Sequence, residues 1–276
     1  MAITAADVNK LRQITGAGMM DCKNALTEAN GDFDAAIDIL RKKGQKVAAK
    51  RADRDATEGL VIAKVTADGT RGVLVCTNCE TDFVAKNADF TAMADRIAGI
   101  ALEKNLDTID ALKAAAYDSN GLTVAEKLIE QTGVIGEKID ISACHALTAG
   151  FVYAYNHPGN KVASLVGLNK TGFETAAKDV AMQVAAMGPI ALDKASTPQS
   201  VIDKELEIGK ELAIQEGKPA DMAEKIAHGR LNKFFKESTL LAQEFIKDNK
   251  LSVEQYLKSV DKDLTCTGFK RHSLTV

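Results

Sequence analysis

Two cysteines in a strand-like stretch have the spacing of a reactive thiol pair. Cys76 and Cys79 are separated by two residues, as in disulfide oxidoreductases and in one half of a tetrahedral zinc site. A zinc site needs a second pair of cysteines or histidines at ligand spacing, and the sequence lacks one. Because Cys76 is expected to point into a sheet, we interpret both cysteines as structural, and we expect no bound metal.

A second set of residues has the types found in hydrolytic sites but not the geometry. Cys144 and His145 are adjacent, and neighbouring residues of a strand point to opposite faces, so they do not form a nucleophile–base pair. His157 lies in a turn-like Tyr-Asn-His-Pro-Gly stretch. The sequence also lacks a Gly-x-x-x-x-Gly-Lys-Ser/Thr phosphate loop and a strand-linked Gly-x-Gly-x-x-Gly motif. We therefore expect a protein that is not an enzyme, binds no cofactor and does not bind nucleotide directly.

A polar stretch with one large aromatic side chain is better suited to recognition. Residues 81–87 read Thr-Asp-Phe-Val-Ala-Lys-Asn and connect a strand-like run to a helix-like run. Loops usually lie on the surface, and an aromatic side chain presented there by rigid neighbours can anchor a contact with another protein. The alternative is that Phe83 folds back and covers the local core. The stretch by itself leaves both interpretations open.

The elements that position these residues begin with three short helices. Apolar residues at helical spacing predict helices over residues 5–14 and 19–29, and a third helix begins after the N-cap Asp32. In the first helix Val8, Leu11 and Ile14 follow one another at spacings of three. The basic residues that follow the third helix, at 45–55, read as a solvated linker.

A strand–strand–helix pattern then occurs twice. The first hairpin covers residues 60–75 and is followed by a helix from about residue 88; the second hairpin covers residues 150–166 and is followed by a helix from residue 173. This looks like an internal duplication, and it predicts two similar α/β lobes with antiparallel sheets. The predicted domains are a helical domain with its linker at 1–54, a first lobe at 55–138 and a second lobe at 139–276.

The two copies differ in length, and the difference falls near Phe83. From Gly59 to Phe90 is 31 residues, whereas the matching interval from Gly150 to Phe173 is 23 residues. We expect most of the additional residues between the strand and the helix of the first lobe. A segment that the second lobe folds without is more useful to a partner than to the fold. This favours Phe83 as an interaction residue.

Residues 196–236 change character again. Two charged helices with narrow apolar stripes flank a Gly-Lys-Pro reversal at residues 217–219. We predict an antiparallel helical hairpin that projects from the core; the alternative is a helix pair packed flat on the core. A further helix at 253–260 and a strand at 265–271, which could join the second sheet, complete the chain.

The composition is that of an ordinary soluble globular protein. Of 276 residues, 46% are apolar and 26% are charged, and the net charge is −3. No apolar run approaches the ~18 residues of a membrane span, and the N-terminus lacks the features of a signal peptide. Five scattered cysteines suit reduced thiols. We therefore expect a cytoplasmic α+β protein with neither membrane nor nucleic acid as a partner.

Two stretches of the chain are similar to signature motifs of one protein family. Leu11-Arg12 is followed by residues 15–23, Thr-Gly-Ala-Gly-Met-Met-Asp-Cys-Lys, and residues 81–85 read Thr-Asp-Phe-Val-Ala. Together they resemble the motifs of the bacterial translation elongation factor Ts family, the nucleotide-exchange factors for elongation factor Tu, and the resemblance covers nearly the whole chain. It implies a three-helix N-terminal domain similar to ubiquitin-associated (UBA) domains, two core lobes and a coiled-coil hairpin.

The resemblance also implies how the chain meets a partner. In the family an Asp-Phe pair enters between two helices of the GTP-binding domain of elongation factor Tu, and the phosphate and magnesium site is disturbed so that GDP leaves. Here the entering segment would be Thr81, Asp82, Phe83 and Val84. A further helix of that domain would be contacted by Arg12, Met19, Met20 and Lys23.

The second lobe departs from the family pattern in two places. Gln183 stands where many relatives have histidine, and the turn before Val162 and Ala163 is less glycine-rich than the family version. The resemblance still implies partner contacts from Val162, Ala163 and Gln183. The chain also stops soon after its last strand, whereas some relatives carry an additional C-terminal helix.

Two other functions compete with nucleotide exchange. An adaptor that binds ubiquitin-like proteins or peptides would use residues 1–54 alone and leave Phe83 idle. A thiol oxidoreductase would use Cys76 and Cys79. Only the exchange function uses both motifs.

Overall fold

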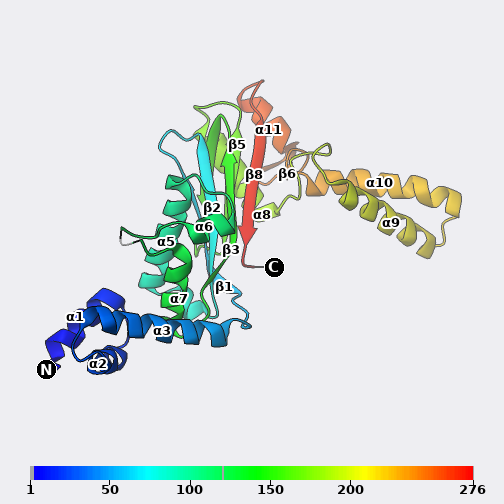
Figure 1. Cartoon of the computed structure of the whole chain (residues 1–276). Coiled ribbons are helices and arrows are strands. Elements are labelled where there is room, and N and C mark those ends of the chain that lie inside the picture. Colours follow the sequence, from blue (N-terminus) through cyan, green and yellow to red (C-terminus); the bar gives the residue numbers. More distant parts are fainter. Residues whose placement is uncertain (1–2, 120, 276) are drawn as a thin grey trace.

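The computed structural model describes residues 3–119 and 121–275 and contains a helical bundle, a sheet core and a helix pair (Figure 1). The helices are α1 (Ala5–Thr15), α2 (Met19–Glu28), α3 (Phe33–Arg51), α4 (Asp82–Ala85), α5 (Ala88–Glu103), α6 (Ile109–Ala114), α7 (Val124–Ile135), α8 (Glu174–Met187), α9 (Gln199–Gln215), α10 (Ala220–Ser238) and α11 (Val253–Val260). The strands are β1 (Glu58–Val65), β2 (Arg71–Cys79), β3 (Asp140–Thr148), β4 (Phe151–Asn156), β5 (Val162–Leu168), β6 (Glu244–Phe245), β7 (Asp248–Ser252) and β8 (Cys266–Ser273). The predicted α+β class is confirmed.

The N-terminal bundle consists of α1, α2 and α3. Thr4 and Asp7 form a capping box at the start of α1, and the Asp32 side chain accepts a hydrogen bond from the Ala35 N–H at the start of α3, as predicted. Leu11 and Leu26 are fully buried in the small core of the bundle. The three predicted helices are therefore present; likeness to a UBA domain stays a prediction.

Helix α3 is longer than predicted. It continues through residues 45–51, which were expected to form the linker. This stretch, Gln-Lys-Val-Ala-Ala-Lys-Arg, consists mostly of good helix formers, so its charge does not prevent a helix. Gly44 does not end the helix, and Gly133 of α7 packs against the α3 backbone at this position.

Two three-stranded antiparallel sheets form the core. The first has the order β1-β2-β3 and the second has the order β4-β5-β8, so the C-terminal strand joins the second sheet as predicted. Strand β3 pairs with β2, with Val75 opposite Cys144, although the predicted boundary after residue 138 assigns its residues to the second lobe. The division into domains itself stays a prediction.

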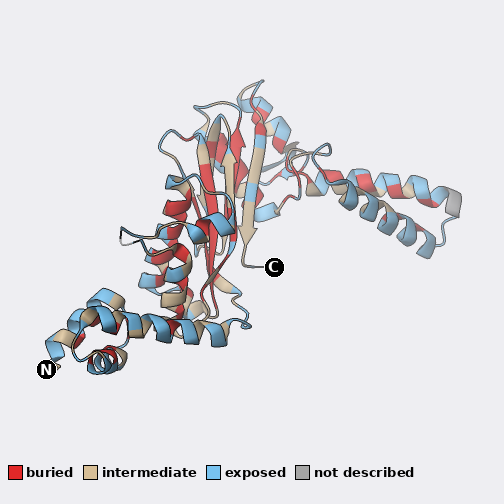
Figure 2. Ribbon diagram, viewed as in Figure 1, coloured by how far each residue is buried: buried red, intermediate tan, exposed pale blue. Residues whose placement is uncertain are grey.

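The sheets pack face to face, and helices cover their outer faces. Leu74 and Cys76 of the first sheet share a buried layer with Val152 and Leu165 of the second. Helix α5 packs on the outer face of the first sheet, and α8 with α11 packs on that of the second. The resulting layers are visible in Figure 2, where the buried residues follow the strands and the inner sides of these helices.

Polar contacts join the edge of β1 to the β4–β5 hairpin. The side-chain amide of Asn156 accepts a hydrogen bond from the Ala63 N–H (2.8 Å) and donates one to the Ala63 carbonyl (3.0 Å). The Val61 N–H donates to the Asn160 carbonyl (2.7 Å). Lys161 also forms an ion pair with Glu58. The two lobes are thus tied together at one end of their sheets.

The length difference between the lobes is distributed differently from the prediction. The connection between β2 and α5 covers residues 80–87 and that between β5 and α8 covers residues 169–173, eight residues against five. Strands β1 and β2 have 8 and 9 residues, whereas β4 and β5 have 6 and 7. Longer strands therefore account for part of the difference, although the connection that carries Phe83 is still the longer one.

Helices α9 and α10 run antiparallel and extend away from the sheets (Figure 1). Small residues allow them to approach closely: a Cβ added at Gly209 would lie 3.1 Å from the Ala227 Cα. The predicted projecting hairpin is present, and the flat packing is not; coiled-coil geometry stays a prediction. None of the helices within the described ranges combines the length and apolar character needed to cross a membrane.

The crossing of α3 and α7 leads to a stability prediction. A Cβ added at Gly133 would lie 2.5 Å from the Gly44 Cα, a backbone atom that cannot give way without moving a helix. We expect Gly133→Ala to lower the free energy of unfolding by about 1–3 kcal/mol. Gly99→Ala is the matched control, because its Cβ would meet only side-chain atoms at 3.7 Å or more, and it should stabilise α5 by about 0.5–1 kcal/mol. Urea denaturation measures both free energies of unfolding. If both substitutions changed this free energy in the same direction, the close crossing of α3 and α7 would be contradicted.

Candidate protein-binding site

Phe83 lies in a single helical turn and not in an irregular loop. Helix α4 follows the N-cap Thr81, whose hydroxyl accepts a hydrogen bond from the Val84 N–H (3.4 Å). Asn87 then caps α5 by accepting hydrogen bonds from two of its N–H groups. The expected loop is therefore corrected to a capped helical turn between a strand and a helix. A four-residue helix is too short to show a helical period in the sequence.

The turn presents the Phe83 ring to solvent. Ala85 is buried, and Val84 packs against the first core, so these two side chains anchor the turn on the inner side. Phe83 lies between them and the surface and is 81% exposed. The alternative in which this ring covers the local core is wrong. An exposed phenylalanine on an anchored turn is a suitable anchor for a pocket on a partner.

Asp82 adds a charge next to the ring. Its carboxylate pairs with the Lys86 ammonium one turn later, at 2.6 Å. The hydrogen bond from Lys86 holds the pKa of Asp82 below its ordinary value, and the same contact raises the pKa of Lys86. Both groups are therefore charged at neutral pH. The edge of the exposed aromatic surface thus carries a fixed pair of opposite charges.

A second exposed apolar patch lies at the junction of α1 and α2. Met19 and Met20 are 55% and 64% exposed, and Arg12 and Lys23 beside them are also exposed. Ile14 is 57% exposed, although it shares the helical spacing of the buried Val8 and Leu11. It lies in the last turn of α1, before Gly16 ends the helix, and the small bundle core does not extend that far. Ile14 instead lines the cavity between the N-terminal bundle and α7 that is described below.

The second lobe contributes its β4–β5 turn at the same end as α4. Lys161 pairs with Glu58 of β1, and the charge of Lys161 helps to lower the pKa of Asp82. Val162 is partly exposed next to this turn, whereas Ala163 is fully buried. The structure thus brings Val162 towards the Phe83 turn, and it leaves the Ala163 side chain no surface for a contact.

Gln183 does not reach the surface either. It is fully buried in α8, where its amide donates to the Gln243 Oε1 (3.1 Å) and the Glu244 carbonyl (3.1 Å) and accepts from the Ile246 N–H (2.8 Å). A direct contact from this side chain is therefore not available in the structure. Its hydrogen bonds instead hold the segment that carries Ile246.

The surface beside Gln183 is an apolar groove that sequence reasoning missed. A cavity of about 210 Å³ is lined by Tyr155, His157, Val162, Met182, Ala185, Ala186 and Ile246. Met182 and Ala186, one on each side of Gln183 along α8, face this groove. The helical spacing of these two residues was a usable signal, because it places them on the face opposite the buried stripe.

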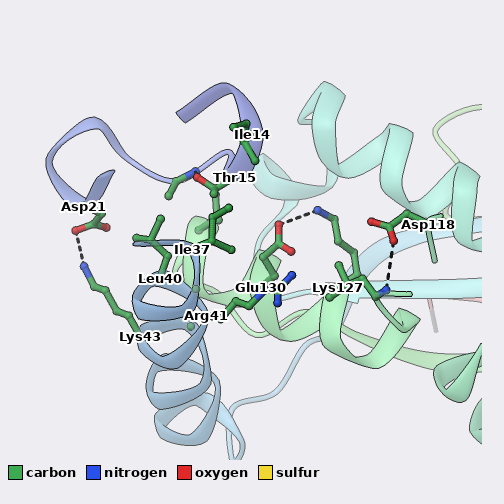
Figure 3. Close-up of a pocket in the computed structure, with 15 residues that line it drawn as sticks. Ile14, Thr15, Asp21, Ile37, Leu40, Arg41, Lys43, Asp118, Lys127 and Glu130 are labelled. Atoms are coloured by element: carbon green, nitrogen blue, oxygen red, sulfur yellow. Dashed lines mark hydrogen bonds and ion pairs between the residues drawn. The ribbon is translucent and has the colours of Figure 1, made fainter. Parts of the chain in front are cut away.

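A further cavity lies between the N-terminal bundle and α7 (Figure 3). Its volume is about 210 Å³, and its apolar wall includes Ile37 and Leu40 of α3. Charged residues at its rim pair with one another: Lys127 with Glu130 at 2.9 Å, and Lys43 with Asp21. Because these charged groups already pair with one another, we interpret the cavity as the packing boundary between the bundle and α7, and not as a site for a charged ligand.

The cysteines are buried, and Cys76 and Cys79 are not arranged as a reactive pair. All five cysteines are free and buried. Cys76 lies in the layer between the two sheets and Cys79 in the core under α5, so their thiols point to opposite faces of the sheet. Burial raises the pKa of Cys79 to about 12 and that of Cys144 to about 11. Within the described residues, no group of three or more His, Cys, Asp and Glu side chains could hold a metal ion.

These thiols are therefore expected to be unreactive in the native protein. With a pKa of about 12, only about one Cys79 in ten thousand is a thiolate at pH 8. We expect modification by a disulfide reagent at pH 8 to proceed at least about a hundredfold more slowly in native than in guanidine-unfolded protein. A rapid reaction of two thiols in the native chain would revive the oxidoreductase alternative.

Comparison with known proteins gives one consistent result. A family model described as "Elongation factor TS" matches residues 80–275. A protein named elongation factor Ts from Christiangramia forsetii is 58% identical over 274 residues, which cover 99% of this chain and 98% of that protein. Proteins of the same name from Flavobacterium psychrophilum and Cytophaga hutchinsonii are 55% and 51% identical, with 99% of this chain covered and 98% and 99% of theirs.

Proposed function

Since the chain belongs to the elongation factor Ts family, we propose that it is the guanine-nucleotide exchange factor for elongation factor Tu in translation elongation, acting in the cytoplasm. The observation that carries this proposal is Phe83, an 81% exposed aromatic ring on a turn anchored from behind by Ala85. Leaving an apolar side chain of this size exposed gives up its burial free energy, which binding to a partner would recover.

The proposed mechanism relies on two separate contacts. Asp82 and Phe83, flanked by Thr81 and Val84, enter between two helices of the GTP-binding domain and displace one of them. The patch of Arg12, Met19, Met20 and Lys23 holds another helix of the same domain. The displacement disturbs the phosphate and magnesium site of the partner, and GDP leaves. No bond is made or broken, and this chain itself binds no nucleotide.

A third contact is proposed for the groove next to Val162. Met182 and Ile246 provide its apolar walls, and Ala163 and Gln183 support it from inside. A groove of this character suits an apolar side chain of the partner. In this proposal Gln183 contributes by holding the Ile246 segment in place, and it makes no direct contact.

The energies involved are of the right size. Burying a phenylalanine or methionine side chain contributes about 1.5–3 kcal/mol, so three or four such contacts contribute about 5–12 kcal/mol, and the upper end equals the ~12 kcal/mol that corresponds to nanomolar nucleotide affinity. Exchange requires that the factor bind nucleotide-free partner more tightly than GDP-bound partner. Because such coupling is reciprocal, GDP or GTP must then weaken the binding of the factor, which allows its release.

The direct test is release of a fluorescent GDP analogue from elongation factor Tu. With the partner preloaded and unlabelled GDP in excess, addition of this protein should raise the release rate in proportion to its concentration until the complex saturates. A release rate that does not respond to the protein would refute exchange activity. An adaptor would bind without changing that rate.

A further inference from the structure

Two glutamates form a reciprocal clamp at the base of the Phe83 turn. Glu80 and Thr81 follow β2, whereas Glu137 and Lys138 precede β3. The Glu137 carboxylate accepts hydrogen bonds from the Thr81 N–H (3.0 Å) and the Thr81 hydroxyl (2.7 Å). In return the Glu80 carboxylate accepts a hydrogen bond from the Lys138 N–H (2.7 Å). Each strand end therefore holds the backbone of the other.

The same clamp reaches the last turn of α3. Arg51 donates from one guanidinium nitrogen to both oxygens of Glu80, at 3.0 and 2.9 Å. The Lys138 ammonium donates to the carbonyls of Ala52 (2.8 Å) and Arg54 (3.0 Å), just beyond the end of the helix. The Glu80 side chain is 16% exposed and that of Arg51 is 33% exposed, so this ion pair is partly shielded from water.

The turn needs such support because it is too short to be stable by itself. An isolated helix of four residues does not form in water, since the cost of nucleation exceeds the gain from its few hydrogen bonds. The Thr81 hydroxyl that caps the turn at the Val84 N–H is the same group that donates to Glu137. Removing Glu137 would therefore leave the cap free to rotate and the turn free to open.

We infer that Glu80 and Glu137 are positioning residues, which hold the Phe83 turn in its presented conformation and connect it, through Arg51, to α3, the helix against which α1 and α2 with the N-terminal contact patch pack. This inference rests on the proposed function. Helix α3 has 19 residues and spans about 28 Å, so the connection sets the spacing between the two contact sites before binding. Because both contact sites are already ordered in the free chain, binding a partner costs less conformational entropy.

Glu137→Ala tests the clamp, and Glu126→Ala is its matched control. Glu126 accepts the same two hydrogen bonds, from the N–H and hydroxyl of Thr123 at 2.8 Å, but at the start of α7. We expect Glu137→Ala to speed hydrogen exchange at the amides of Val84 and Ala85 by about tenfold or more, and Glu126→Ala to leave them unchanged. Glu137→Gln keeps one acceptor oxygen and should give an intermediate value. This measurement needs no partner, so it tests the clamp even if exchange activity is absent.

The functional consequence is tested by combining the change with Phe83→Ala. In nucleotide release from elongation factor Tu, we expect Glu137→Ala to reduce the stimulated rate about tenfold when Phe83 is present and less than about twofold when it is replaced. An equal reduction in both backgrounds would mean that Glu137 supports the fold in general. Unchanged hydrogen exchange at the Val84 and Ala85 amides in Glu137→Ala would overturn the inference.

The link to α3 is tested with Arg51→Met, which keeps the apolar stem and removes the ion pair. We expect it to raise the dissociation constant for nucleotide-free elongation factor Tu about threefold to tenfold, because the two contact sites are then no longer held at one spacing. Arg96→Met is the control. Arg96 pairs with Glu103 of the same helix, α5, at 2.8 Å, so this ion pair does not connect the two contact sites. Equal effects of the two changes would contradict the role of Arg51.

Discussion

Replacing Phe83 with alanine is expected to lower the stimulated rate of GDP release from elongation factor Tu by about tenfold or more. The ring is exposed in the free chain, and burying it in the partner contributes about 1.5–3 kcal/mol. Each 1.4 kcal/mol corresponds to a factor of ten, and this contact is made best with the displaced helices of the nucleotide-free partner. The loss should therefore appear in the release rate measured at saturating factor.

The stability of the free chain should not change with this substitution. Because the side chain has few contacts of its own, we expect the free energy of unfolding of Phe83→Ala to lie within about 0.5 kcal/mol of the unsubstituted protein. Val260→Ala is a suitable control and should leave the rate of GDP release unchanged. Val260 is 44% exposed on α11, which lies at the other end of the core from the N-terminal bundle in Figure 1. A silent Phe83→Ala would favour the adaptor function, which uses the bundle alone.

The second large effect is expected from the methionine patch. We predict that Met19→Ala combined with Met20→Ala raises the dissociation constant for nucleotide-free elongation factor Tu roughly thirtyfold, equivalent to about 2 kcal/mol. Both side chains are more than half exposed and adjacent, so the partner can bury them together. Isothermal titration calorimetry measures the change, and the heat-capacity change of binding should become less negative because less apolar surface is buried.

The control for this patch is another exposed methionine. Met222 on α10 is 51% exposed, close to the value for Met19. We expect Met222→Ala to change the affinity by less than about threefold. If it weakens binding as much as the double substitution does, the effect is not specific to the bundle, and the role assigned to Met19 and Met20 is wrong.

Much of the architecture follows from local sequence signals. The spacing of apolar residues and the N-cap Asp32 predict the bundle helices, and the repeated strand–turn–strand pattern predicts both hairpins. The polar stretch at residues 81–87 leaves the exposure of Phe83 open, and only the longer interval in the first of the two repeated lobes favours it. The helices and hairpins depend mainly on neighbours within a few residues, so the sequence by itself determines them.

Other features depend on residues far apart in the chain, and only the tertiary structure decides them. Glu137 holds Thr81 across 56 positions, and the passage of α3 over α7 depends on Gly133 meeting the backbone at Gly44, a pairing that local patterns cannot predict. Gln183 turns inward because the segment before Ile246 offers its backbone as a partner, and Ile14 turns outward because the bundle core ends before it. Periodicity shows which residues share a face of a helix, but not what lies against that face. Burial and long-range hydrogen bonding settle this, and both arise only when the chain has folded.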